Sequence, residues 1–489
     1  MVAQCPEIEP DWTPRCSGFV PSCSNFSIQY NYACASIAVA IMLSHNDDTI
    51  LGAIADYPEP RWAQHFLLSI VFIGSVFGML IMGYLGDFLG VQRALVCTNV
   101  LVVFGSLASA ALSWGPPQVV WGIIAASRFI LGVGVGGNYP LSAAKAAEAA
   151  PASLKDAVAK TGAAFFWQGP GACAPYLLAL GLLHLPHRAG VTSLQFRTLF
   201  ALGAIPAFVV LIASIQESKS DGVVDTPTSQ RLGRAEALRD SRHWRTLVGT
   251  AGTWFLFDVA FYGTVIFVPV ILGRVFGARQ TLGGLAWRAA FMSLLGTSGT
   301  IAGLVALPRI GAKALNTAGL ALGCMLFVVC MLLFEFQPAW HATTFFVLCL
   351  LFLVLYSGPN VATFVLPVLA FPREVRSTFH GLSAAAAKVG AMIGSLLFPA
   401  INDSFGVSAV MATQALVLAV GVILSHLCIS CESETPPVHV TQAVDAEVEL
   451  AECVGRCADD VGGTQLQEGR PSVKAAKTHG TIEKQKLVP

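Results

Sequence analysis

Twelve apolar stretches, each long enough to cross a lipid bilayer as a helix, constrain this chain more than any other feature. A helix rises about 1.5 Å per residue, so about 20 predominantly apolar residues span the hydrocarbon core. Only 12% of the residues are charged, against about 25% in a soluble domain. The sequence therefore predicts an all-α polytopic membrane protein with spans at roughly 27–45, 63–86, 94–114, 119–141, 160–184, 195–215, 246–272, 287–307, 314–336, 342–368, 379–401 and 405–429.

The longest internal polar stretch, residues 216–245, separates the twelve spans into two sets of six. We therefore expect an N-terminal six-helix bundle over 27–215, a central cytoplasmic loop over 216–245 and a C-terminal six-helix bundle over 246–429. Residues 1–26 are polar, without the charged start and apolar core of a signal peptide, and are expected to be a cytoplasmic segment. The polar tail, 430–489, is predicted to be disordered and cytoplasmic.

Basic residues are distributed unevenly between the loops on the two sides of the predicted membrane. With the N-terminus inside, fourteen Lys and Arg residues fall in cytoplasmic loops, which agrees with the positive-inside rule. We therefore expect both termini in the cytoplasm and a plasma-membrane location, with an internal membrane as the alternative. The six on the opposite side are Arg61, Arg188, Arg197, Arg274, Arg279 and Arg288.

Charge balance and cysteine spacing exclude several other classes of protein. Lys+Arg and Asp+Glu number 29 each, so there is no basic excess to bind nucleic acid. The cysteines lack the spacing of metal ligands, and no Ser/His/Asp or Cys/His arrangement recurs. We expect no metal, no cofactor and no enzymatic activity.

Three formal charges lie well inside predicted spans, at Arg128, Asp258 and Lys388. A charge at this depth costs a few kcal/mol, so it faces a partner or a water-filled cavity. Together they sum to one positive charge, which favours an anionic substrate. Structural alternatives are a helix-to-helix tie for Arg128, an Asp258–Lys388 pair that only joins the two halves, and a Lys388 that reaches the interface.

Five neutral polar side chains also fall in segments that are otherwise apolar. On a helix, two of them would lie on the same face as Asp258, one turn to either side. Hydroxyl, amide and indole donors around a cation can hold a small oxyanion, although each group alone could equally form an interhelical hydrogen bond. These side chains are Tyr139, Gln168, Trp254, Tyr262 and Asn360.

The two predicted halves repeat a pattern at corresponding positions. The fourth span ends at Pro140 with Glu148 beyond it, and the tenth ends at Pro367 with Glu374 beyond it. Parallel repeats around a site at the membrane midplane are typical of alternating-access carriers.

Several motifs resemble those of a known superfamily. Gly83, Asp87, Gly90 and Arg93 match its loop signature Gly-x-x-x-Asp-x-x-Gly-x-x-Arg, the signature of the major facilitator superfamily. The segments RFILGVGVGGNYPLS (128–142), Gly-Pro-Asn at 358–360 and FPREVRSTFHG (371–381), with the Trp254/Asp258/Tyr262 helix, are similar to fungal and plant phosphate:proton symporters. The resemblance covers nearly all twelve spans. It implies the major facilitator fold, a gating loop at the signature, and secondary transport of inorganic phosphate together with protons.

The same resemblance implies a ligand set. The phosphate ligands of that family lie in spans four, five, seven and ten, and a lysine lies in span eleven. By position they carry over to Tyr139, Gln168, Trp254, Asp258, Tyr262, Asn360 and Lys388.

The sequence departs from the family where protons are handled. Asn138 replaces the acid of Gly-Gly-Asp-Tyr-Pro, and the first span has no acid between Gln29 and Ser36. Asn cannot take up a proton at physiological pH, which leaves Asp258. We hypothesise that coupling is reduced, rerouted through Asp258 or lost, and that Arg128, with Lys388, is freer to face the anion. Two alternatives are a carrier of organic phosphate esters such as glycerophosphodiesters and a phosphate sensor that does not transport.

Overall fold

The computed structural model describes residues 18–44, 56–63, 66–149, 154–186, 190–220, 235–276, 281–336 and 340–429. Within these ranges the chain is helical almost throughout and contains no β-strand. The predicted N-terminal segment as far as residue 17, residues 221–234 of the central loop, Arg188, Arg279 and the tail from residue 430 lie outside the described residues.

In the part of the chain that the structure describes, eight helices build the half before the central loop. Two of its spans are broken, at Trp167 and at Gly203, because Pro170 and Pro206 lack the N–H groups that would continue the helical ladder. The helices are α1 (Phe19–Met42), α2 (Phe66–Leu89), α3 (Val91–Ala111), α4 (Pro117–Glu148), α5 (Leu154–Phe166), α6 (Gln168–Leu183), α7 (Val191–Leu202) and α8 (Ala204–Ser220).

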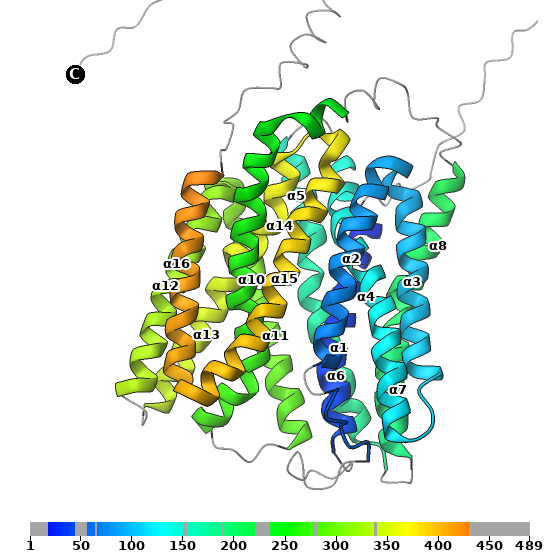
Figure 1. The fold of residues 1–489 in the computed structure, drawn as a ribbon, viewed down its shortest axis with the longest axis vertical. Helices are drawn as coiled ribbons and strands as arrows, with labels where there is room; N and C mark the ends of the chain where they lie inside the picture. Colours follow the sequence, from blue (N-terminus) through cyan, green and yellow to red (C-terminus); the bar gives the residue numbers. More distant parts are fainter. Residues whose placement is uncertain are drawn as a thin grey trace, which may run out of the picture. The chain divides into compact units, whose positions relative to one another are not determined.

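The second half follows the same plan, with one span broken at Gly358-Pro359. Its elements are α10 (Ser241–Phe276), α11 (Leu282–Ile310), α12 (Ala312–Phe336), α13 (His341–Ser357), α14 (Pro359–Ala370), the 3₁₀ turn η1 (Arg373–Val375), α15 (Arg376–Phe405) and α16 (Val407–Cys428). Helices α12, α13 and α16 lie at one flank of the bundle, and α3, α7 and α8 lie at the opposite flank (Figure 1).

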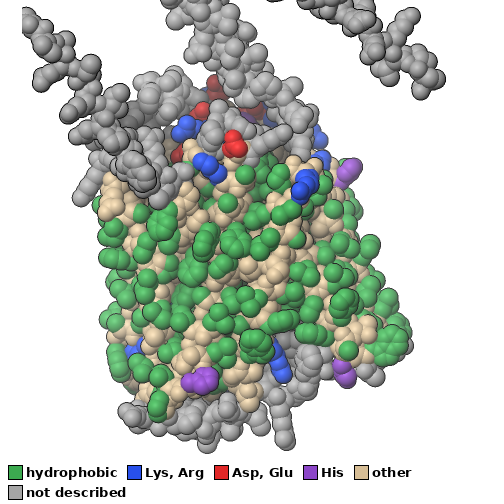
Figure 2. All heavy atoms as spheres, turned by 180° about the vertical axis from the view of Figure 1, so that it is seen from behind, with side chains coloured by type: hydrophobic (Ala, Val, Ile, Leu, Met, Phe, Trp, Pro, Cys, Tyr) green, Lys and Arg blue, Asp and Glu red, His purple; other side chains and the backbone are tan. Residues whose placement is uncertain are grey.

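Among the described residues, nine helical spans are long and apolar enough to cross a membrane. The other three predicted windows correspond to α1, α5–α6 and α10. Figure 2 shows the surface that such spans require, with hydrophobic side chains over the middle of one face and charged side chains near its ends.

Helix α1 begins at Phe19, ahead of the predicted window start at residue 27. Its polar side chains are buried between helices, so average hydropathy underestimates its length. The Asn25 Nδ2 donates to the Pro21 carbonyl at 2.9 Å and to Ser142 Oγ at 3.3 Å. Interhelical hydrogen bonds of this kind satisfy polar groups that lipid could not.

Close contacts at glycine bring helices together within each of the two halves. A Cβ at Gly136 of α4 would lie 2.2 Å from the Ser75 carbonyl oxygen of α2. In the second half, a Cβ at Gly394 of α15 would lie 2.1 Å from the Val259 carbonyl oxygen of α10. Only glycine permits such an approach, and the second contact places α15 directly against the helix that carries Asp258.

Candidate functional site

A buried ion pair lies at the centre of the candidate site. The Lys388 Nζ of α15 donates to Asp258 Oδ2 of α10 at 3.0 Å and to the Tyr262 hydroxyl at 2.9 Å. The Lys388 and Asp258 side chains are only 2% and 3% exposed. The structure therefore contains the Asp258–Lys388 pair that is one of the alternatives predicted from the sequence, and neither charge faces lipid.

Aromatic rings from both halves of the chain surround this ammonium group. The Nζ of Lys388 lies 4.2 Å from the ring centroid of Tyr262, 5.2 Å from that of Tyr139 and 5.7 Å from that of Tyr32. Tyr139 and Tyr32 belong to the first half and Tyr262 belongs to the second. Cation–π contacts stabilise the charge and bring the two halves together at a single cation.

Trp254 lies beside the ion pair, one turn before Asp258 on α10. Its ring centroid is 6.5 Å from that of Tyr139, 6.4 Å from that of Phe364 and 5.6 Å from that of His380. These buried rings form an aromatic layer on the side of the ion pair nearer the first turn of α15. The structure thus brings together four of the predicted site residues, Tyr139, Trp254, Asp258 and Tyr262, with Lys388.

A chain of amide hydrogen bonds connects Gln168 to this cluster. The Gln29 Nε2 donates to Gln168 Oε1 at 2.8 Å and to the Tyr139 hydroxyl at 3.3 Å. The Gln168 Nε2 in turn donates to Asn25 Oδ1 at 2.7 Å. In the sequence alone, Gln29 is only one of the polar residues that interrupt the first predicted span. Its spacing from Asn25 and Tyr32, four residues before it and three after, places all three on one helix face and could have identified it.

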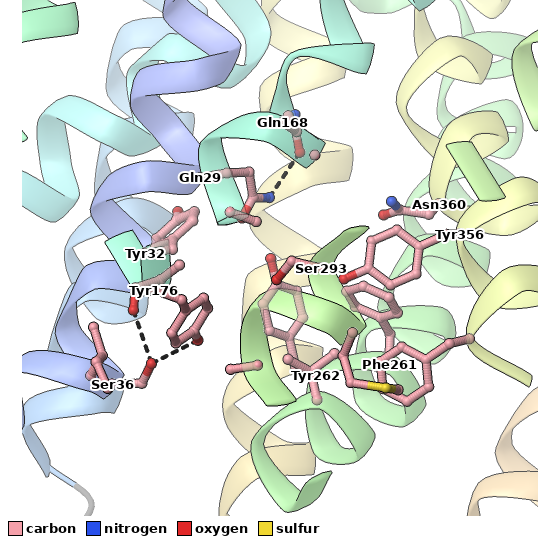
Figure 3. Close-up of a pocket in the computed structure, with 18 of the residues that line it drawn as sticks. Gln29, Tyr32, Ser36, Gln168, Tyr176, Phe261, Tyr262, Ser293, Tyr356 and Asn360 are labelled. Carbon is pink, nitrogen blue, oxygen red and sulfur yellow. Dashed lines mark hydrogen bonds between the residues drawn. The ribbon is translucent and has the colours of Figure 1, made fainter. Parts of the chain in front are cut away.

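A cavity of about 340 Å³ opens next to these groups. Figure 3 shows Gln29, Gln168 and Tyr262 around it, with Asn360 of α14 across from them. Tyr32 and Tyr262, whose rings face Lys388, also line the cavity. Polar donors from both halves therefore converge on one space, and the ion pair lies directly behind its wall.

The structure does not bring Arg128 to this cavity. Its side chain is buried, donates to the Asn31 carbonyl, approaches Cys34 Sγ at 3.6 Å and lies over the Phe200 ring at 5.1 Å. Arg128 precedes Tyr139 by eleven residues on α4, which is about 16 Å along a helix axis. The expected surplus of positive charge at the site therefore does not come from Arg128.

The predicted gating loop joins the two halves where α2 ends and α3 begins, here called the α2–α3 end. Asp87 Oδ1 accepts from the Ser377 N–H at 3.1 Å, and its Oδ2 accepts from the Thr378 N–H at 2.7 Å and the Thr378 hydroxyl at 2.6 Å. A carboxylate at the first turn of α15 is favourable because it satisfies N–H groups that lack helical partners. An ion pair between Arg373 and Glu148, at 3.6 Å, also crosses between the halves.

The other signature residues act differently. A Cβ at Gly83 would lie 2.8 Å from the Ser377 carbonyl oxygen, so this glycine permits α2 to pack against α15. Gly90 has a φ of 91° and turns the chain into α3, while Arg93 is exposed at the start of α3. The two halves thus make contact at the α2–α3 end, and the aromatic layer lies between that contact and the cavity.

We expect Asp87→Ala to slow uptake, because it removes the acceptor for three donors that hold the halves together at the α2–α3 end. Loss of such a cap costs about 1–2 kcal/mol, which lowers the relative population of this conformation about 5- to 30-fold. The measurement is the initial uptake rate in proteoliposomes, with Asp87→Asn, which keeps one acceptor oxygen, expected to lose less. A wild-type rate in Asp87→Ala would contradict a gating role for this contact.

Two helical halves that make contact at one end and share a cavity beside a buried ion pair define the chain as a multi-pass membrane carrier. The chain belongs to the family of sugar (and other) transporters, whose model matches residues 18–220 and 244–435. Membership of a transporter family agrees with the expectation that the protein is not an enzyme.

Among curated proteins, the inorganic phosphate transporter PT2 of Toxoplasma gondii is 32% identical over 396 residues, which cover 80% of this chain and 68% of that protein. Inorganic phosphate transporter 1-6 of Oryza sativa subsp. japonica is 30% identical over 432 residues, covering 76% of this chain and 80% of that protein. The predicted relationship to phosphate transporters is thereby confirmed.

Solved structures establish the fold. A structure of the major facilitator superfamily proton:xylose symporter XylE bound to 6-bromo-6-deoxy-D-glucose is similar with a TM-score of 0.65 at 17% identity, covering 85% of this chain and 95% of that chain. The E. coli fucose:proton symporter FucP is similar with a TM-score of 0.60 at 12% identity, covering 85% and 100%. The predicted all-α major facilitator fold is confirmed.

Proposed function

We propose that this transporter carries inorganic phosphate by alternating access, with Lys388 supplying the positive charge that an oxyanion requires. The observation that carries the proposal is the position of the Lys388 ammonium, which both halves contact directly behind the cavity wall. Donors from Gln29, Gln168, Tyr262 and Asn360 around the cavity can complete the coordination of a tetrahedral anion. The names of the curated relatives, which are inorganic phosphate transporters, support phosphate over other anions as the substrate.

We further propose that the proton, where one is coupled to phosphate, is carried by Asp258. Asn138, which stands where the related symporters have an acid, is buried and forms a reciprocal amide pair with Asn99 at 3.2 and 3.3 Å. Such a pair satisfies both amides without a proton to exchange. Asp258, by contrast, is an acid in direct contact with the cation that the anion would approach, so its charge and that of the substrate are coupled.

The size of the cavity supports a second candidate, an organic phosphate ester. A volume of about 340 Å³ falls within the range of about 300–1,000 Å³ that is common for small-molecule sites. Phe261, Phe352 and Tyr356 also give one wall an aromatic surface that an organic group could contact. On this proposal the ester's phosphoryl group would occupy the amide end and its organic group the aromatic wall.

A panel of substrates tests these proposals. The purified protein is reconstituted in vesicles, and uptake of labelled phosphate, glycerophosphodiesters and a neutral sugar is measured with an inward proton gradient and with the gradient collapsed. Saturable phosphate uptake that esters do not inhibit favours the first proposal, and inhibition by esters favours the second. Binding of phosphate without flux would indicate a sensor, and sugar uptake without phosphate uptake would overturn the proposals.

We place the carrier in the plasma membrane with both termini cytoplasmic, which immunolabelling of intact and permeabilised cells tests.

The amide chain gives a prediction for substrate affinity. We expect Gln29→Leu to raise the KM for phosphate about tenfold, because a lost hydrogen bond that leaves buried partners unsatisfied costs about 1–2 kcal/mol. The change removes the donor to Gln168 and Tyr139 at similar side-chain volume. Gln92→Leu is the matched control, since Gln92 donates to the Ser214 carbonyl at 2.9 Å and does not line the cavity. Equal KM values for the two variants would show that Gln29 does not contribute to phosphate binding.

A further inference from the structure

The polar side chains that line the cavity differ in whether they already have a partner within the protein. Those that take part in a hydrogen bond or another interaction are Gln29, Tyr32, Ser36, Gln168, Tyr176, Tyr262, Arg288 and Thr300. Among the described residues that line the cavity, the remaining polar side chains are Ser293, Tyr356 and Asn360, which form no hydrogen bond with the protein. Their donors and acceptors are therefore open to a ligand.

These three open groups all belong to the second half of the chain and lie close together. A Cβ at Gly296 of α11 would lie 2.7 Å from Tyr356 Cζ, the ring carbon that carries the hydroxyl. Ser293 precedes Gly296 by three residues on the same helix, which is less than one turn. Asn360 follows Tyr356 by four residues, just beyond the break that ends α13. Figure 3 shows Asn360 beside Tyr356, with Ser293 on the side of the Tyr356 hydroxyl.

The amide side of the cavity lies about one helical turn away from this group. Gly169, next to Gln168, packs against Thr297 of α11, since a Cβ there would lie 2.4 Å from Thr297 Oγ1. Ser293 precedes Thr297 by four residues, which is about 6 Å along the helix axis. A phosphoryl group joined to a short carbon chain can bridge that separation, so one substrate can contact both sides of the cavity.

The chemistry of the open groups suits the hydroxyl groups of an alcohol. A serine hydroxyl, a tyrosine hydroxyl and an asparagine amide each offer both a donor and an acceptor. An alcohol hydroxyl uses both, whereas the oxygens of an ionised phosphate only accept. Aromatic rings beside Tyr356 provide apolar contact for carbon atoms, since its ring centroid lies 5.0 Å from that of Phe261 and 6.2 Å from that of Phe352.

We propose that Ser293 and Tyr356 form a hydroxyl-binding subsite, which holds the alcohol part of a phosphate ester while its phosphoryl group lies towards Gln168. Asn360 borders the subsite and completes it. The inference rests on the second candidate under the proposed function, and it names the substrate class as phosphate esters of small alcohols that carry free hydroxyl groups, such as glycerol phosphate.

The test compares glycerol phosphate with propyl phosphate, which has a carbon chain of the same length and no free hydroxyl. Each ester is added unlabelled to proteoliposomes that contain the full chain, and inhibition of labelled inorganic phosphate uptake is measured. Wild-type protein is expected to bind glycerol phosphate about tenfold more tightly, because an analogue without hydroxyls leaves polar groups of the site unpaired. Ser293→Ala combined with Tyr356→Phe removes both protein hydroxyls and should reduce this preference to about threefold or less. The KM for inorganic phosphate should stay unchanged.

Thr300→Val is the matched control, because Thr300 also lines the cavity but its hydroxyl donates to the Gly296 carbonyl at 3.2 Å. Equal inhibition by the two esters, or inhibition by neither, with normal phosphate uptake would overturn the subsite and leave phosphate transport intact. A raised KM for inorganic phosphate in the double variant, with the preference between esters retained, would also overturn it.

A wild-type protein that neither binds nor takes up phosphate or either ester would overturn both the subsite and the proposed function. A double variant that is absent from the membrane is replaced by Ser293→Ala alone. A reduced preference for glycerol phosphate in that variant supports the subsite, and the wild-type preference overturns it.

Discussion

Lys388→Ala is expected to abolish phosphate uptake and to destabilise the folded protein by about 3–5 kcal/mol, because removing one partner of a buried ion pair leaves the other charge uncompensated. Asp258 is 3% exposed and would lose its hydrogen bond from the Lys388 ammonium. The same substitution removes the cation that Tyr139 and Tyr262 surround. The measurements are uptake in vesicles and thermal unfolding in detergent.

A double variant separates the loss of stability from the loss of the cation. Lys388→Gln combined with Asp258→Asn leaves no buried charge in the pair, so most of the stability should return while uptake stays abolished. Lys313→Ala is the control for loss of a lysine, since Lys313 is only partly buried at the start of α12 and does not line the cavity. Wild-type phosphate uptake by Lys388→Ala would contradict the role of this lysine in binding the anion.

Asp258→Asn is expected to uncouple transport from the proton gradient. Asparagine has nearly the shape of aspartate but no proton to exchange, so accumulation driven by an inward proton gradient should fall to the equilibrium level. Exchange of external for internal phosphate needs no net proton movement and should persist. Uptake with and without a gradient, together with phosphate exchange in the same vesicles, measures both effects.

The exchange assay distinguishes uncoupling from misfolding, because a misfolded carrier loses both activities. Asp156→Asn is the matched control, since Asp156 is exposed in the first turn of α5. An Asp258→Asn carrier that still concentrates phosphate in a proton-dependent manner would show that another group carries the proton. The next substitution would then be an acid at Asn138, the buried residue that pairs with Asn99 at 3.2 Å.

The helical spans could be predicted because a helix in lipid must satisfy its own backbone and present apolar side chains, and both requirements are visible in local composition. The prediction was less accurate for α1, whose polar residues Asn25, Gln29 and Asn31 bond to other helices. Their partners lie in α4, α6 and the α7–α8 break, far away in the sequence.

The sequence also indicated which charges matter, since Asp258 and Lys388 stand in spans where a charge without a partner is costly. Helical periodicity placed Trp254, Asp258 and Tyr262 on one face of one helix. Periodicity could not determine which helices face one another. The positions of two arginines relative to the cavity depend on this packing. Arg128 faces α1 and the Phe200 ring. Arg288, which the sequence pattern assigns to a loop, lies on α11 and lines the cavity.

The sequence by itself therefore determined the class of the protein, its helices and the side chains that cannot rest in lipid. Only the tertiary structure decided that Lys388 pairs with Asp258, that Gln29 belongs to the site and that Arg288 faces the cavity while Arg128 does not. The physical reason is that each helix separately must satisfy its own backbone hydrogen bonds and present apolar side chains to lipid. A binding site instead forms where helices distant in sequence are packed together by close contacts such as the one at Gly394.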